Sequence, residues 1–295
     1  MDWKDILNNY IDIVTKELEK YMDINYSKNN KLIEAMKYSL MAGGKRLRPV
    51  LAMASYEFFS SDLEKVMPYA CGLEMIHTYS LIHDDLPAMD NDDYRRGKLT
   101  NHKVFDEGVA ILAGDGLLNY AFEIMLENTI KQDNMGPYVE AMRIIANAAG
   151  INGMIGGQIV DIENEDKNID GETLDYIHLN KTAALIAASM KVGAVIGGAA
   201  KNDIDNMEYI GKNLGLAFQI RDDVLDIIGV KNKLGKNVGS DESQNKSTYP
   251  SLYGMEYSIE KIKECTHNAH ERMQVYDKKA DFIYNLSNYL VNRDF

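Results

Sequence analysis

One stretch decides the fold class, residues 63–83, which read LEKVMPYACGLEMIHTYSLIH. Apolar side chains recur along it at the spacing of an α-helix. The same period returns in residues 109–130, 137–151, 174–200, 207–228, 259–273 and 282–291. Sustained alternation with a period of two, which would indicate strands, is absent, and the chain contains only five prolines to interrupt helices. The sequence therefore predicts an all-α protein.

Length and charge bound the architecture and the partners. The chain has 295 residues, and none of its polar loop segments resembles an interdomain linker, so we expect a single domain over residues 1–295. It carries 45 acidic and 32 basic residues, a net charge of −13. Because binding along a nucleic-acid backbone needs a broad basic face, we expect no nucleic-acid partner.

Compartment and membrane association are also suggested by the sequence. Cys71 and Cys265 show no disulfide or zinc-site spacing, which is typical of buried free thiols in a reducing compartment. Residues 1–5 are polar, unlike a signal peptide. Residues 183–200 are nearly apolar, but Lys191 at their centre would cost roughly 2.5–3.5 kcal/mol to insert into a bilayer. We expect a cytoplasmic protein without a membrane span.

The first helical run ends in an acidic cluster, residues 84–93, with the sequence DDLPAMDNDD. Its apolar lead-in indicates that the cluster emerges from a core helix. Pro87 interrupts any continuing helix, so Asp90 can turn back towards Asp84. Carboxylates this close repel one another unless water or cations neutralise them. A solvated loop is one interpretation and a cation site is the other. An EF-hand is excluded because its third position, a ligand, would be Leu86, and its sixth, a glycine, would be Met89.

A second acidic cluster, Asp222-Asp223-Val-Leu-Asp226, lies in the run 207–228. Asp222 and Asp226 are four residues apart and share one helix face, with Gln219 one turn earlier. Apolar neighbours argue against a fully solvated face. Mg²⁺ accepts one or two carboxylates and completes its shell with water and substrate phosphates, so this cluster could bind it.

Basic residues gather in a few places despite the net negative charge. These are Gly43-Gly44-Lys45-Arg46-Leu47-Arg48-Pro49, Arg95-Arg96-Gly97-Lys98, Lys181-Thr182, and a loop with Lys236 and Lys246. The first is not a Walker loop, because no glycine stands five residues before Gly44. Each group alone could serve solubility. Beside two carboxylate clusters, however, they are what a diphosphate requires.

Two further sites admit a functional and a purely structural interpretation. His77 lies two helical turns before Asp84 on the same face, so it either looks into the same cavity or is an ordinary core histidine. Gln158 and Asp161 form an i,i+3 pair that helix packing explains equally well.

Together these elements resemble the trans-type polyprenyl synthases over nearly the whole chain. Residues 84–90 match the bacterial form of the first Asp-rich motif, and residues 222–226 match the second. The other family elements follow in order at Gly44–Pro49, Arg95-Arg96, Lys181-Thr182 and Phe218-Gln219. Leu99, where the family has Pro, and Asn245, where it has Gly, depart from the pattern. The similarity is greatest to the bacterial members that form farnesyl diphosphate.

The resemblance implies a bundle of long helices around a deep central cavity, usually paired as a homodimer. It also implies a Mg²⁺-dependent condensation of isopentenyl diphosphate with the allylic substrates dimethylallyl and geranyl diphosphate. Three Mg²⁺ ions, or Mn²⁺, would be held by Asp84, Asp90 and Asp222, with Asp85, Asp223 and Asp226 as supporting or water-mediated ligands.

The same resemblance assigns the substrate contacts. Isopentenyl diphosphate would be bound by Lys45, Arg48, His77 and Arg96, where Gly44 permits close approach. The allylic diphosphate would be bound by Arg95, Lys181 and Lys236, and Thr182 and Gln219 would turn oxygens towards the developing carbocation.

Product length is predicted from Tyr79, with Ser80 beside it. Tyr79 stands five residues before Asp84, about 7.5 Å along a helix, where a ring could close the pocket to tails longer than C15. The other interpretation is a core aromatic. The expected product is (2E,6E)-farnesyl diphosphate, with geranylgeranyl or geranyl diphosphate as alternatives.

Two other classes of protein use similar parts. A terpene cyclase is disfavoured by Gly44–Arg48 and by the second Asp-Asp-x2-Asp motif. A non-catalytic regulatory subunit is disfavoured because such chains usually lose an Asp-rich motif, and this chain keeps both.

Overall fold

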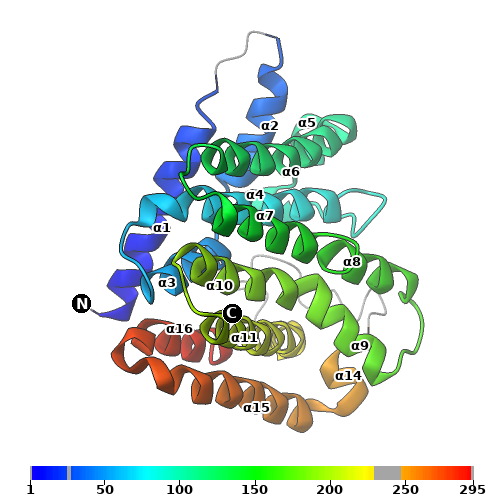
Figure 1. Ribbon diagram of the computed structural model, residues 1–295. Helices are drawn as coiled ribbons and strands as arrows, with labels where there is room; N and C mark the ends of the chain where they lie inside the picture. The colour runs from blue at the N-terminus through cyan, green and yellow to red at the C-terminus, as the bar shows by residue number, and fades with distance from the viewer. Residues whose placement is uncertain (1, 25–27, 229–246, 294–295) are drawn as a thin grey trace.

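The computed structural model describes residues 2–24, 28–228 and 247–293, and within them almost every element is helical (Figure 1). The first half contains α1 (Trp3–Tyr21), α2 (Asn30–Leu40), α3 (Leu47–Glu57), η1 (Leu63–Lys65), α4 (Met67–Asp84), α5 (Asn101–Phe105), α6 (Glu107–Thr129) and α7 (Gly136–Ala149). The second half contains α8 (Met154–Glu163), α9 (Gly171–Ile177), the π-helical η2 (His178–Ala183), α10 (Ala184–Ile196), α11 (Lys201–Ile228), α14 (Tyr249–Tyr253), α15 (Met255–Met273), η3 (Gln274–Ala280) and α16 (Asp281–Val291). The prediction of an all-α protein is confirmed.

Two local features differ from the sequence-based expectation. The helix expected from residue 63 begins at Met67, because Pro68 suits a first helical turn and residues Leu63–Lys65 form a separate 3₁₀ turn. Helix α3 shows little periodicity because it is buried almost all round, including Leu51, Met53 and Tyr56.

Close helix packing at the centre explains the run of small residues at 183–200. A Cβ added to Gly193 of α10 would lie 2.2 Å from the carbonyl oxygen of Ala52 in α3. One added to Gly215 of α11 would lie 2.6 Å from the Cα of Ala183. Figure 1 shows α10 beside α11, and α15 on the far side of α11. These glycines let the helices that frame the site approach one another closely.

The core joins distant parts of the chain and comprises two clusters of buried apolar side chains among the described residues. Its larger cluster of buried apolar side chains takes residues from Tyr10 in α1 to Leu290 in α16. Cys71 and Cys265 are buried free thiols, as expected. The assignment of a single domain stays a prediction.

Among the residues that the structure describes, two helical stretches are long and apolar enough to cross a membrane by length and composition alone. They are Glu107–Thr129 and Gly171–Ile196, and 39% and 67% of their apolar windows are buried inside the protein. Within the second stretch, α10 packs against α3, α7 and α11. The absence of a membrane span stays a prediction.

Candidate active site

The first acidic cluster turns back on itself as predicted. Asp84 is the last residue of α4, and its carbonyl accepts a hydrogen bond of 2.8 Å from the backbone N–H of Asp90. Leu86 is buried beneath the turn, and its carbonyl accepts the N–H of Asn91 at 3.1 Å. The turn that follows Pro87 therefore brings Asp90 to the end of α4.

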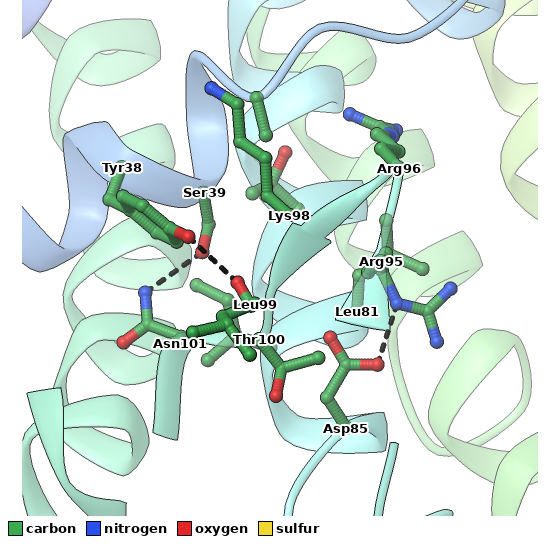
Figure 2. A pocket seen from close by; sticks show the side chains of 13 residues that line it. Tyr38, Ser39, Leu81, Asp85, Arg95, Arg96, Lys98, Leu99, Thr100 and Asn101 are labelled. Carbon is green, nitrogen blue, oxygen red and sulfur yellow. Dashed lines mark hydrogen bonds and ion pairs between the residues drawn. The ribbon is translucent and has the colours of Figure 1, made fainter. Parts of the chain in front are cut away.

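Asp85 is paired with an arginine of the same chain. Its buried carboxylate accepts a hydrogen bond of 2.6 Å from Nε of Arg95, which Figure 2 shows pointing towards it. Burial raises the pKa of Asp85 to about 7, against the opposing effect of Arg95. The contact fits Asp85 as a supporting residue, and it places Arg95 beside the first cluster.

A short hairpin aims the two neighbouring arginines in different directions. Strands β1 (Tyr94–Arg95) and β2 (Lys98–Leu99) pair antiparallel around Arg96 and Gly97, which both have positive φ, as hairpin turns of this kind require. This hairpin was not expected from the sequence, because its strands are too short to show alternation. Whereas Arg95 reaches Asp85, Nη1 of Arg96 donates to the carbonyl of Gly43.

The hairpin is tied to α2 across a small cavity of about 30 Å³ (Figure 2). The hydroxyl of Tyr38 donates to the carbonyl of Leu99 at 2.8 Å, and the amide of Asn101 donates to the hydroxyl of Ser39 at 2.8 Å. Leu99 contributes its backbone carbonyl, which a proline would present as well. The departure from the family pattern at this position therefore leaves the contact intact. The deep central cavity stays a prediction.

The loop before α3 joins the hairpin to the second acidic cluster. Gly44 has φ +117°, and a Cβ there would lie 2.6 Å from Cζ of Arg96, so only glycine fits. Desolvation and the nearby charge of Arg293 lower the pKa of Lys45 to about 8, against the opposing effect of Asp222. Lys45 thus lies in the electric field of the second cluster, while Arg96 contacts the same loop from the first.

Arg48 follows this loop, and its charge acts on His77 of α4. Nε of Arg48 is buried and has no hydrogen-bond partner among the described residues. Burial lowers the pKa of Arg48 to about 10, with Glu74 opposing and Arg96 adding to the effect. Burial, followed by the charges of Arg48 and Arg96, holds the pKa of His77 well below its usual range. His77 is therefore a neutral imidazole beside guanidinium groups.

The second acidic cluster contacts a residue that sequence reasoning missed. Arg293 is buried, pairs with Asp222, and lies with its guanidinium 4.2 Å from the ring centroid of Phe218. Its carbonyl accepts hydrogen bonds from Arg221. No motif marks Arg293, since it lies 71 residues from Asp222.

Asp223 organises the residues assigned to the carbocation. It accepts hydrogen bonds from Nε2 of Gln219 at 3.1 Å and from the backbone N–H of Tyr249 at 3.0 Å, and His178 lies 3.4 Å away. The hydroxyl of Thr182 donates to Oε1 of Gln219 at 2.7 Å. Asp223 thereby fixes the orientation of the Gln219 amide, and Gln219 in turn fixes Thr182.

A π-helical turn presents Lys181 and Thr182 between α8 and α11, and such turns are frequent at functional sites. Nζ of Lys181 pairs with Asp161 at 2.6 Å. A Cβ on Gly157 would lie 2.3 Å from the backbone nitrogen of Lys181, so Gly157 permits this approach. Asp161 is explained by this contact, whereas Oε1 of Gln158 is buried without a hydrogen-bond partner in the described part of the chain.

Tyr79 and Ser80 sit within the final turns of α4. Tyr79 is 5% exposed, and its ring packs edge-to-face on His83 with centroids 5.7 Å apart. Its hydroxyl finds no hydrogen-bond partner among the described residues. Burial and the charge of Asp84 raise the pKa of Tyr79 to about 12. The hydroxyl of Ser80 donates to the carbonyl of His77 at 2.9 Å.

The acidic residues form no closed metal cage by themselves. Within residues 2–24, 28–228 and 247–293, no group of three or more His, Cys, Asp or Glu side chains is placed to hold a metal ion. Their carboxylate oxygens still suit Mg²⁺, which takes one or two protein ligands and completes its shell with phosphate and water. Lys236, Lys246 and Asn245 lie outside the described residues.

Comparisons with known proteins show the family to which the chain belongs. A sequence profile of the Polyprenyl synthetase family matches residues 29–286. A farnesyl diphosphate synthase of Geobacillus stearothermophilus is 49% identical over 258 residues, covering 87% of this chain and 86% of that protein. A geranylgeranyl diphosphate synthase of Cyanophora paradoxa is 46% identical over 264 residues, covering 89% and 88%.

A solved structure extends the similarity to the whole fold. An FPP/GFPP synthase from Zymomonas mobilis superposes with a TM-score of 0.88 at 33% identity, covering 98% of this chain and 99% of that one. The chain is therefore a prenyltransferase of the polyprenyl synthetase family.

Proposed function

We propose that this prenyltransferase condenses isopentenyl diphosphate with dimethylallyl and then geranyl diphosphate to give (2E,6E)-farnesyl diphosphate. The observation that carries the proposal is the basic loop at residues 43–48, which contacts the hairpin of the first acidic cluster and lies in the field of the second. Binding two diphosphates requires carboxylates that hold cations and, separately, basic side chains that contact the phosphate oxygens. The relatives differ in product length, so the C15 product rests on Tyr79.

The carboxylates assigned to Mg²⁺ or Mn²⁺ are Asp84, Asp90 and Asp222, with Asp85 and Asp226 in support. Bound Mg²⁺ neutralises negative charge on a leaving diphosphate and so favours cleavage of its C–O bond. The protein contacts of Asp85 and Asp223 suit orienting roles, because each carboxylate is already held by a donor.

The chain's own residues then bind and orient the two substrates. Arg95 and Lys181, together with Lys236, bind the allylic diphosphate, while Lys45, Arg48, His77 and Arg96 bind isopentenyl diphosphate. The oxygens of Thr182 and Gln219, 2.7 Å apart, stabilise the allylic cation. The double bond of isopentenyl diphosphate attacks this cation, and the departing diphosphate takes the proton that is lost.

Product analysis tests the proposal directly. The purified protein would be incubated with isopentenyl and dimethylallyl diphosphates and Mg²⁺, and the products separated by chain length. We expect C15 as the main product and none in the presence of a chelator. A C10 or C20 product would support the alternatives, a cyclic hydrocarbon would indicate a terpene cyclase, and no product would indicate a regulatory subunit.

The hairpin offers a matched pair of variants for the two substrate sites. Arg96→Ala is expected to raise KM for isopentenyl diphosphate about tenfold or more, because a charge-assisted hydrogen bond contributes about 1.5–3 kcal/mol. KM for the allylic substrate should change little. Steady-state kinetics with each substrate varied in turn measure both values. Arg95→Ala should show the opposite preference, and the reverse ordering would mean that the two sites are exchanged.

We also propose that the protein acts as a cytoplasmic homodimer. Leu112 of α6 and Ile130, which caps the C-terminal end of that helix, are 58% and 65% exposed, and their spacing of eighteen residues places them on the same side of it. Val139 of α7 and Ile151 beyond it are 55% and 79% exposed. Exposed apolar side chains on these two contacting helices suit burial against a second copy of the chain.

Charged side chains at Leu112 and Ile130 should therefore separate the subunits of the proposed homodimer. The double variant Leu112→Glu/Ile130→Glu is expected to elute as a monomer at micromolar concentration in size-exclusion chromatography with light scattering. Val275→Glu, at a residue that is 68% exposed after α15, is the control and should remain dimeric. A double variant that is still dimeric would place the interface elsewhere.

A further inference from the structure

We infer that Glu74 of α4 and Arg46 form a buried ion pair that positions the basic loop, residues 43–48, for the diphosphate of isopentenyl diphosphate. The inference deepens the proposed function and rests on it. Neither residue touches substrate in this assignment, so both are positioning residues that act through Lys45 and Arg48.

The pair fixes the loop to the helix that carries the first acidic cluster. Oε1 of Glu74 lies 2.8 Å from Nη1 of Arg46, and the two side chains are 1% and 2% exposed. Nη2 of Arg46 also donates to the carbonyl of Leu40 at 2.6 Å. Arg46 is therefore held from two sides inside the protein.

The backbone conformation of the loop depends on a contact such as the one between Arg46 and Glu74. Gly43, Gly44 and Arg46 all have positive φ, and Arg46 does so at +47° without being glycine. A left-handed residue with a side chain persists where surrounding contacts determine it. The buried guanidinium provides that contact, and it does so immediately before the first turn of α3, which carries Arg48.

Glu74 also sets the charge of the site. It contacts only Arg46 among the described guanidinium groups, but its charge also acts on Arg48 and Arg96. Neutral His77 lies one turn further along the same helix. Because the guanidinium groups outnumber the carboxylate, the cluster keeps a positive charge that a diphosphate can neutralise.

A positioning role and a purely stabilising role make different predictions. Buried ion pairs can often be replaced by well-packed apolar residues without loss of stability, whereas removing one partner is strongly destabilising. If the pair only stabilises the fold, replacing both residues by apolar ones should leave substrate binding normal. If the pair positions the loop, substrate binding should stay impaired, since apolar side chains cannot hold the loop by directed hydrogen bonds.

The experiment compares Glu74→Gln with the double variant Glu74→Leu/Arg46→Met. In Glu74→Gln we expect KM for isopentenyl diphosphate to rise at least tenfold, with kcat and the allylic KM within about threefold of wild type and a lower melting temperature. The double variant should regain most of the melting temperature and keep the raised KM. Tyr69→Phe is the control, since it removes a buried hydrogen bond to Thr129 from the same helix without touching the loop.

The outcomes separate this inference from the proposed function. A double variant with normal KM for isopentenyl diphosphate would show that the pair only stabilises the fold, and an equal rise in both KM values would contradict a role in one substrate site. Calorimetric titration with inorganic diphosphate gives a readout without turnover, in which the double variant should bind at least tenfold more weakly than wild type. If the wild-type protein formed no prenyl product, the proposed function would be overturned. The titration would still test whether the Glu74–Arg46 pair positions the loop for diphosphate binding.

Discussion

Replacement of Asp84 or Asp222 by alanine is expected to lower kcat by about a thousandfold or more while the helices remain folded. Each change removes a proposed ligand of a cation that stabilises charge only as the C–O bond ionises, and losses of this kind fall on kcat. Asp84 ends α4 and the side chain of Asp222 is 38% exposed, so neither truncation leaves a cavity in the core.

The measurement is kcat at saturating substrates and Mg²⁺, with circular dichroism to confirm folding. Asp93→Ala is the matched control, because Asp93 lies in the same acidic cluster, pairs with Lys103 and has no assigned ligand role. Its turnover should stay near wild type. Near-normal turnover in Asp84→Ala or Asp222→Ala would contradict the metal assignment.

Arg293 requires a second control for the Asp222 variant. Asp222→Ala removes the partner of Arg293 as well as the proposed ligand. Arg293→Met would break the same ion pair while leaving the carboxylate in place. If the two variants lose the same activity, the ion pair and not the metal explains the effect, and we expect the loss in Asp222→Ala to be far larger.

Local sequence signals predicted the helices and the turn of the first cluster well. Pro87 predicted the turn that brings Asp90 back to Asp84, and helical periodicity predicted α6, α7 and α11. Helix α3 was not predicted from the sequence, because nearly all of its sides are buried. Helical periodicity is visible only where an apolar face alternates with a polar one.

The residues missed at the site are those whose partners lie far along the chain. Glu74 meets Arg46 from 28 residues away and Arg293 meets Asp222 from 71, and neither contact leaves a pattern in sequence. Arg95 and Arg96 were assigned to different substrates by resemblance. Their contacts in the structure diverge because Arg95 ends strand β1, whereas Arg96 lies in the turn that follows with a positive φ.

Tyr79→Ala is expected to shift the main product from C15 to C20 or longer. The growing tail would extend from the end of α4 back along the helix, and Tyr79 stands about 7.5 Å before Asp84. Its ring is buried against His83, and its hydroxyl has no hydrogen-bond partner in the described part of the chain. Removing the ring would open space at the depth where a fourth isoprene unit would need it.

Tyr79→Phe separates the volume of the ring from its chemistry. Because the hydroxyl has no partner among the described residues, the phenylalanine variant should keep both its stability and the C15 product. The alanine variant loses a buried ring, which costs about 3–5 kcal/mol for comparable aromatic truncations, so products should be analysed well below its melting temperature. Chromatography of the dephosphorylated alcohols gives the length distribution. If Tyr79→Ala is folded and still stops at C15, the ring is an ordinary core aromatic, and the end of the pocket must be sought on a helix facing α4.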